Sequence, residues 1–459
     1  MNTSAAEQIK VVPSEKISMK EKIGYATGDL ACNFIYKTIS SYLLFFYTDV
    51  FGISATVAGV MFLIVRMLDA VLDPLIGTIV DRTNTKYGRF RPYLLYGAVP
   101  FAVLAILCFT TPEFSDVGKI VYAYITYILL SIIYSTINVP YSALTAAITQ
   151  DNKEVVSLTS IRMLFSNGGG MIVSFCVPFL ASIFTKTTGN TATGWQITMT
   201  IMGIAGAILL ILSFLNTKER IQISEEESKV GFKDIFTQLR VNRPLVIVCL
   251  FFLFNFGINS IINAVGIYYV TYNVARPDLV KWYGLMGTLP ALILMPLIPV
   301  LYKVLGKKKL LFIALSCKAI GLLALFIIPS SMVPLVFAGR LIASIGTITS
   351  GAFTWALVPE TIDYGEYKTG KRASGVVYAL VNFFFKFGMA LGGIVPGLIL
   401  SNFGYVANHV QTETALHGIL ITLTVIPAIF VIIELFAIFF YKLDEKEHER
   451  VLAELNARR

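Results

Sequence analysis

Charged residues are scarce in this sequence. Only 14% of its 459 residues are Asp, Glu, Lys or Arg, whereas 56% are hydrophobic and the mean hydropathy is +0.73. Soluble globular domains carry about 25% charged residues. The composition therefore excludes a solvated multidomain enzyme and predicts a protein embedded in a membrane.

Cysteines and catalytic motifs are also sparse. Five cysteines lie in apolar stretches without the spacing of a disulfide framework or a metal site: Cys32, Cys108, Cys176, Cys249 and Cys317. We expect them to be small buried hydrophobic residues. The sequence has no glycine-rich phosphate loop of the Walker type, which disfavours ATP-driven pumping. We predict no catalytic residue, no metal and no cofactor apart from a coupling ion.

Long apolar segments, in contrast, are abundant. Charged or Gly/Pro-rich breaks separate about twelve of them, each long enough to cross a hydrocarbon core of about 30 Å. They are residues 24–48, 53–80, 93–112, 119–149, 157–185, 194–216, 244–271, 281–303, 310–329, 333–362, 374–402 and 414–441. The expected fold class is an all-α membrane protein.

The longest polar interruption, residues 218–243, divides the chain into two sets of about six segments. We predict a cytoplasmic tail at 1–22, a six-helix bundle at 23–217, a cytoplasmic linker at 218–243, a second bundle at 244–441 and a cytoplasmic tail at 442–459. Two such halves with a midplane site are typical of major facilitator transporters.

The net charge of +9 comes from basic residues that cluster in alternate loops and at both termini. By the positive-inside rule these loops and both termini are cytoplasmic, in a multi-pass protein of the inner membrane. The basic residues are therefore orientation signals near membrane lipids, and no nucleic-acid partner is predicted.

Three charged residues, Arg66, Asp69 and Asp73, lie inside the second apolar segment. Their spacing of three and four residues places them on one helical face. Each ionised group near a bilayer centre costs roughly 2.5–3.5 kcal/mol, so such groups pair, face a cavity or bind a ligand. Two interpretations follow: a structural ion-pair network between helices, or a cation or proton site.

Four motifs resemble those of the glycoside-pentoside-hexuronide:cation symporter family. They are Arg66-x-x-Asp69-x-x-x-Asp73-Pro74, Gly88-Arg89-Phe-Arg91-Pro92, Asn138-Val-Pro140-Tyr141 and Asp363-Tyr364-Gly365-Glu366-Tyr367-x-x-Gly370-x-Arg372. They stand in the family's order, and the resemblance runs from about residue 21 to 443. It implies a major facilitator fold with two six-helix halves and cation-coupled sugar symport. The stretch from Gly404 to Thr412 is more similar to glucuronide and xyloside carriers than to melibiose permease.

Melibiose permease, a member of that family, binds its galactoside through two aspartates. The resemblance places Asn33 and Asn138 at the positions of these two aspartates. Neutral amides still bond to vicinal hydroxyls, but they add no negative charge that would repel an anionic sugar.

Lys37 stands one turn beyond Asn33, on the same helical face as Tyr36. One interpretation makes Lys37 the counter-ion of a substrate carboxylate. The other makes it a structural partner of Asp29, Asp69 or Asp73.

The resemblance assigns further residues to the two sites. Ser135 and Lys386 join Asp69 and Asp73 at the cation site, with Lys386 as the natural partner of either aspartate when no cation is bound. Tyr134 and Arg162 join Asn33 and Asn138 at the substrate site. Tyr36, Lys37, Trp355 and Asn382 are further candidates for that site, Trp355 as a platform for the apolar face of the sugar. Interhelical hydrogen bonding, snorkelling of Arg162 and packing of Trp355 are the structural alternatives. Lys318 and Arg340, also inside apolar segments, receive no assignment.

The sequence thus predicts a sugar symporter whose partners are a small glycoside, a coupling cation and membrane lipids. We favour H+ over Na+ because Leu72, just before Asp73, replaces an asparagine oxygen of melibiose permease. The expected substrate is a glycoside such as a glucuronide or other hexuronide, with a pentoside as the neutral option. A lipid or other small-molecule transporter of the same superfamily is the alternative, and a sensor or channel is a more distant one.

Overall fold

The computed structural model describes residues 17–149, 151–221, 232–441, 443 and 445–458. This part of the chain is built of helices and contains no strand, with one isolated bridge between Thr85 and Gly88. The predicted all-α fold is therefore confirmed. Residues 1–16 of the predicted tail and 222–231 of the predicted linker lie outside the described residues.

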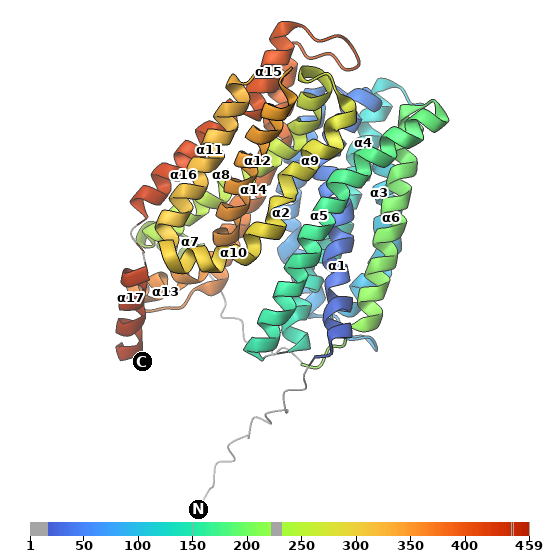
Figure 1. The fold of residues 1–459 in the computed structure, drawn as a ribbon. Coiled ribbons are helices and arrows are strands. Elements are labelled where there is room, and N and C mark those ends of the chain that lie inside the picture. The colour runs from blue at the N-terminus through green and yellow to red at the C-terminus, as the bar shows by residue number, and fades with distance from the viewer. Residues whose placement is uncertain (1–16, 150, 222–231, 442, 444, 459) are drawn as a thin grey trace, which may run out of the picture.

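The first half is a bundle in which α1 packs against α5 and α6, and α3 packs against α4 and α6. Its elements are α1 (Met19–Thr38), η1 (Ile39–Leu43), η2 (Phe46–Val50), α2 (Ala55–Asp81), α3 (Arg91–Cys108), α4 (Asp116–Ile148), α5 (Asn152–Thr188) and α6 (Thr191–Asn216). Figure 1 shows α1, α5, α3 and α6 grouped together.

The second half repeats this arrangement, with α8 packed against α14 and α16, and α11 packed against α12 and α16. Its elements are α7 (Phe232–Val241), α8 (Arg243–Tyr268), η3 (Tyr269–Asn273), η4 (Pro277–Leu279), α9 (Val280–Thr288), α10 (Pro290–Leu305), α11 (Lys307–Ile327), α12 (Val333–Thr354), α13 (Leu357–Thr369), α14 (Ser374–Asn402), α15 (Glu413–Leu423), α16 (Val425–Phe440) and α17 (Glu445–Arg458). The helix α7 lies within the predicted linker.

Eleven helical stretches of the described chain are long and apolar enough to cross a membrane. The stretch from α1 to η2 is also helical throughout, but polar residues such as Asp29 and Lys37 lower its hydropathy, so it is not one of the eleven. Two π-helical turns, η1 and η2, interrupt its regular geometry. Such turns are rare and frequently occur at functional sites.

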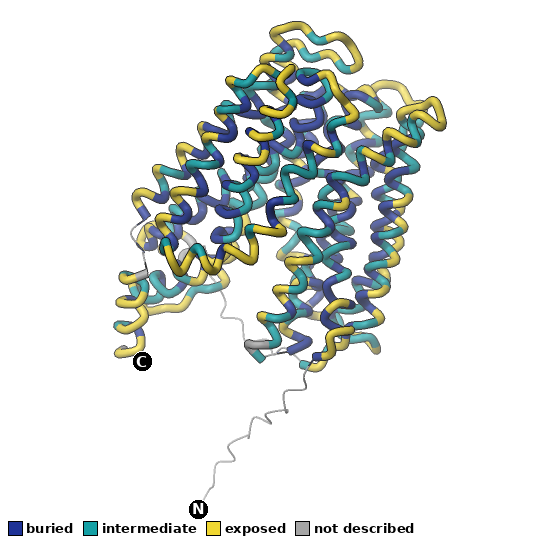
Figure 2. Tube along the Cα trace, viewed as in Figure 1, coloured by how far each residue is buried: buried dark blue, intermediate teal, exposed yellow. Residues whose placement is uncertain are grey.

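Burial follows the two-bundle arrangement. Buried positions line the facing sides of the helices, while exposed positions lie on outer faces and in loops (Figure 2). Large apolar side chains remain exposed on the outer faces, for example Val99 on α3 and Ile208 on α6. A membrane supplies the apolar surroundings that such surfaces need, because contiguous exposed apolar patches are rare in soluble monomers.

Glycines allow the two halves to pack closely against each other. On α14, a Cβ atom at Gly393 would lie 2.2 Å from Cβ of Phe62, and one at Gly397 would lie 2.4 Å from the carbonyl oxygen of Ala55, both on α2. These contacts involve the start of α2 and the end of α14. That end of the bundle, which we call the far side, is opposite the two chain termini (Figure 1).

A hydrogen-bond network around Asp49 joins the halves on the far side. The Tyr405 hydroxyl donates to Asp49 Oδ1 at 2.6 Å, and the Tyr272 hydroxyl donates to the same oxygen. Asn408 Nδ2 donates to the Asp49 carbonyl at 2.5 Å. Burial, reinforced by the Asp49 charge, raises the pKa of Tyr405 far above its ordinary value, so its hydroxyl remains a donor at physiological pH. The far side is therefore closed in this structure.

Candidate functional site

The charged face of α2 forms a chain of contacts that runs from one half to the other. Arg66 Nη1 lies 3.0 Å from Asp69 Oδ2, and both side chains are buried. The hydroxyl of Ser131, on α4, donates to the other oxygen, Asp69 Oδ1, at 2.5 Å. Both oxygens of Asp69 are therefore occupied.

Asp73, one turn further along α2, meets the second half. Lys386 Nζ, on α14, lies 2.5 Å from Asp73 Oδ2 and donates to the carbonyl oxygen of Asp69 at 2.5 Å. Asp73 Oδ1 is buried and has no hydrogen-bond partner among the described residues. The ion pair thus bridges the halves and leaves one carboxylate oxygen available to a proton or cation.

Ser131 was not among the predicted site residues. The resemblance pointed to Ser135, which is buried one turn along the same helix, but it is Ser131 that bonds to Asp69. Their four-residue spacing puts both serines on one face of α4. This shared face is the only sequence signal that indicated Ser131.

Aromatic residues connect the charged chain to the predicted substrate residues. Tyr36 and Tyr134 stack with ring centroids 5.5 Å apart, and the Arg66 guanidinium lies 5.5 Å from the Tyr36 ring centroid. A small cavity is lined by Tyr36, Ile39, Arg66, Tyr127, Leu130, Ser131 and Tyr134. The cavity therefore borders both Arg66 and Ser131, the two partners of Asp69.

Two predicted substrate residues, Asn33 and Arg162, are engaged within the first half. Arg162 holds Asp29 through two hydrogen bonds of 2.7 and 3.2 Å, and its guanidinium lies over the Tyr141 ring. Asn33 Nδ2 donates to the Asp29 carbonyl at 2.9 Å and to Ser166 Oγ at 3.0 Å.

Lys37 has no carboxylate partner among the described residues. Its Nζ donates to Oδ1 of Asn263, on α8 of the second half, at 2.8 Å. The three aspartates considered as structural partners are each paired with another cation: Asp29 with Arg162, Asp69 with Arg66 and Asp73 with Lys386. An ammonium group bonded only to a neutral amide is what an anionic ligand would complement.

The remaining predicted residues are not drawn into this chain of contacts. Trp355 packs edge-on against Phe252, with centroids 4.8 Å apart, and is 43% exposed. Asn382 lies exposed on α14, one turn before Lys386. Asn138 is half-buried, and its side chain makes no hydrogen bond within the described chain. The described residues contain no cluster of His, Cys, Asp and Glu that could hold a metal ion.

Comparisons with known proteins identify the family. The family described as MFS/sugar transport protein matches residues 24–445. The chain is 62% identical to the uncharacterized symporter YnaJ of Bacillus subtilis (strain 168), over 97% of this chain and 96% of that protein. It is 35% identical to an isoprimeverose transporter of Lactiplantibacillus pentosus, over 98% and 94%. It is 32% identical to a glucuronide carrier protein homolog of Escherichia coli (strain K12), over 97% of both chains.

A likeness to solved structures supports the fold. The crystal structure of the nucleoside transporter NupG matches with a TM-score of 0.65 at 12% identity, covering 92% of this chain and all of that one. The family and fold expected from the sequence motifs are therefore confirmed. The chain belongs to the glycoside-pentoside-hexuronide:cation symporter family of the major facilitator superfamily, and is a multi-pass membrane transporter of sugars rather than an enzyme.

Proposed function

We propose that this protein imports an anionic glycoside of the hexuronide class together with one H+, with both termini in the cytoplasm. The observation that carries the proposal is the Asp73–Lys386 ion pair, which joins the two halves and leaves Asp73 Oδ1 without a partner. A proton on Asp73 would remove the charge that holds Lys386. Proton binding would therefore change the free energy of the contact between the halves, as coupled alternating access requires.

The choice of ion follows from the number of oxygens available. Sodium needs several oxygen ligands, whereas a proton needs one carboxylate oxygen. Both carboxylate oxygens of Asp69 are bonded, to Arg66 and Ser131, and the residue before Asp73 is Leu72. The single open oxygen on Asp73 supports H+ as the coupling ion.

The choice of substrate class follows from charge. Among the described residues, the Lys37 ammonium bonds to the neutral amide of Asn263 and to no carboxylate. The two positions where aspartates would repel a carboxylate are the neutral Asn33 and Asn138. One relative in the family is named a glucuronide carrier homolog, and another an isoprimeverose transporter. The unpaired ammonium favours the first kind of ligand, because charge-assisted hydrogen bonds are roughly twice as strong as neutral ones.

Transport in proteoliposomes containing the purified protein tests this function. A hexuronide and its neutral glycoside counterpart are supplied at equal concentration under an inward pH gradient. We expect the hexuronide to accumulate and the medium to become alkaline. Faster uptake of the neutral glycoside would overturn the substrate class, and sodium-stimulated uptake without alkalinisation would overturn the choice of ion.

A further inference from the structure

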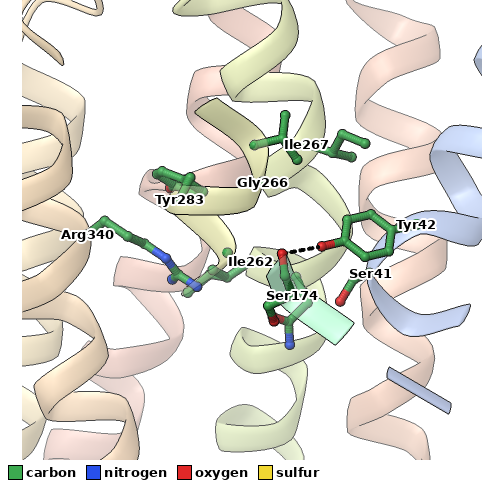
Figure 3. A pocket seen from close by; sticks show the side chains of 11 residues that line it. Ser41, Tyr42, Ser174, Ile262, Gly266, Ile267, Tyr283 and Arg340 are labelled. Atoms are coloured by element: carbon green, nitrogen blue, oxygen red, sulfur yellow. Dashed lines mark hydrogen bonds between the residues drawn. The ribbon is translucent and has the colours of Figure 1, made fainter. Parts of the chain in front are cut away.

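A second cavity lies between the two halves, separate from the charged residues Arg66, Asp69 and Asp73 of α2. Its walls come from η1 and α5 of the first half and from α8, α9 and α12 of the second. Figure 3 shows Arg340 reaching from α12 toward this space, with Ser174 and Tyr42 on the opposite side, where the Tyr42 hydroxyl donates to the Ser174 carbonyl. No residue of the charged chain on α2 lines it.

Arg340 brings an uncompensated charge to the cavity. It is only 8% exposed, and its Nε has no hydrogen-bond partner among the described residues. Its Cζ lies 5.2 Å from the centroid of the Tyr283 ring, which gives a cation–π contact. Because an arginine side chain keeps its proton in proteins, it cannot escape this cost by becoming neutral.

Four other basic residues inside the membrane helices have an acidic partner, whereas Arg340 and Lys37 have none among the described residues. The four pairs are Arg66–Asp69, Arg162–Asp29, Lys386–Asp73 and the fully buried Lys318–Glu434. Ionisable residues at membrane depth pair with one another or mark a ligand site. Arg340 has no such pair in the described chain.

Two further polar residues line the cavity with Arg340. The Tyr283 hydroxyl lines the same cavity, is buried and also lacks a hydrogen-bond partner in the described chain. Asn263, which holds Lys37 Nζ at 2.8 Å, is another wall residue. Asn263 therefore links Lys37 to the wall that carries Arg340. A negatively charged ligand in the cavity would accept from the unbonded Arg340 Nε and Tyr283 hydroxyl.

The neighbouring backbone is shaped to admit the guanidinium. A Cβ atom at Gly287, on α9, would lie 2.2 Å from Arg340 Nη2. Any side chain at Gly287 would therefore displace the guanidinium from the place where it faces the cavity. The position of Arg340 thus depends on a glycine in an adjacent helix.

We infer that this cavity is an anion site that binds a carboxylate through Arg340 and the Tyr283 hydroxyl, distinct from the coupling pair of Asp73 and Lys386. Two sources share this chemistry: the substrate's own carboxylate and a free small carboxylate. The first source rests on the proposed function, whereas the second does not.

Two binding measurements on the full-length detergent-solubilised protein test the inference. The first compares the affinities of a hexuronide and its neutral counterpart in the parent, Arg340→Gln, Arg340→Lys and Gly287→Ala proteins. We expect Arg340→Gln to weaken hexuronide binding about tenfold or more and to leave neutral binding within about twofold, because only the anion loses a charged partner. Arg340→Lys should lose less, and Gly287→Ala should resemble Arg340→Gln.

The second measurement titrates sodium acetate and follows the thermal midpoint. A midpoint that rises in the parent but not in Arg340→Gln supports a site for free carboxylates, and comparison of the two proteins cancels general salt effects. The control is Arg276→Gln, which removes an exposed cation that pairs with Asp278 and does not line the cavity. It should behave like the parent in both measurements.

The outcomes separate this inference from the proposed function. If the parent binds no hexuronide, the proposed function fails while the acetate titration still tests the cavity. If acetate does not distinguish the parent from Arg340→Gln, and that variant binds both glycosides like the parent or weakens both equally, the anion site is overturned. Arg340 is then a packing partner of Tyr283.

Discussion

Removing the Asp73 charge should uncouple sugar movement from the ion gradient. In Asp73→Asn, Lys386 keeps its hydrogen bond to the Asp69 carbonyl but loses its ion pair. No site remains at position 73 where a proton could change the contact between the halves. We expect uphill accumulation to be lost and counterflow exchange to persist, because exchange needs substrate binding but no net proton movement.

The size of the expected change can be worked out from the stoichiometry. A gradient of one pH unit stores about 1.4 kcal/mol, which corresponds to a tenfold concentration ratio for one H+ per sugar. A monovalent hexuronide moving with one H+ carries no net charge, so membrane potential adds nothing. The parent should therefore accumulate hexuronide about tenfold per pH unit, and Asp73→Asn should reach a ratio of about one.

The free energy of unfolding gives a second, independent measure of the Asp73–Lys386 ion pair. Breaking a buried ion pair costs about 3–5 kcal/mol, whereas an exposed pair is worth about 0–1 kcal/mol. The Asp73 side chain is 33% exposed and that of Lys386 12%, so we expect about 1–3 kcal/mol for Asp73→Asn. Adding Lys386→Gln should restore part of this loss, since no uncompensated charge then remains, but should not restore accumulation.

The ratio of internal to external hexuronide is measured by uptake of the labelled compound into proteoliposomes. The membrane potential is clamped at zero. Counterflow in the same vesicles shows whether binding survives. Asp278→Asn is the matched control, because this aspartate is exposed and pairs with Arg276 away from the site. An Asp73→Asn protein that still accumulates hexuronide tenfold would refute the assignment of coupling to Asp73.

Three further variants test the other contacts. Lys37→Ala should reduce the preference for a hexuronide over its neutral counterpart while neutral binding stays within about twofold, and an equal loss for both ligands in titrations would make Lys37 structural. Ser131→Ala removes the hydrogen bond to Asp69 and should lower the thermal midpoint and the pH-driven accumulation ratio, whereas unchanged values for both would exclude a role for this serine. Tyr405→Phe removes one donor to Asp49 and should increase labelling of a cysteine introduced on the far side; labelling equal to that of the parent would show that Tyr405 does not help to close it.

Much of the fold followed from the apolar segments, because membrane thickness fixes helix length. The predicted segment 374–402 and α14 have the same bounds, and predicted segment 194–216 begins three residues after the start of α6. The π-helical turns η1 and η2 were not predicted, since they add backbone residues without changing hydrophobicity. The helix α7 was also missed, because its residues are polar enough to be taken as linker.

The candidate site was predictable where residues are close in sequence. The three-residue spacing of Arg66 and Asp69 indicated a shared face, and the structure places them in contact. Contacts between distant helices were less accessible: the motif resemblance brought Lys386 to the aspartates without choosing between them, and the structure pairs it with Asp73. The partner of Lys37, Asn263, was not foreseen, because periodicity gives the face of a helix but not the residue opposite.

The positions of Lys37 and Asp73 explain how one carrier could respond to both a substrate carboxylate and a proton. Lys37 and Asp73 both belong to the first half, and each contacts the second half through a single polar partner, Asn263 or Lys386. A substrate carboxylate at Lys37 competes with Asn263, just as a proton on Asp73 competes with Lys386. Each ligand therefore weakens one contact between the same two bodies. Because the free energies of these contacts act on one shared motion, binding of either ligand changes the affinity for the other, which is the requirement for symport.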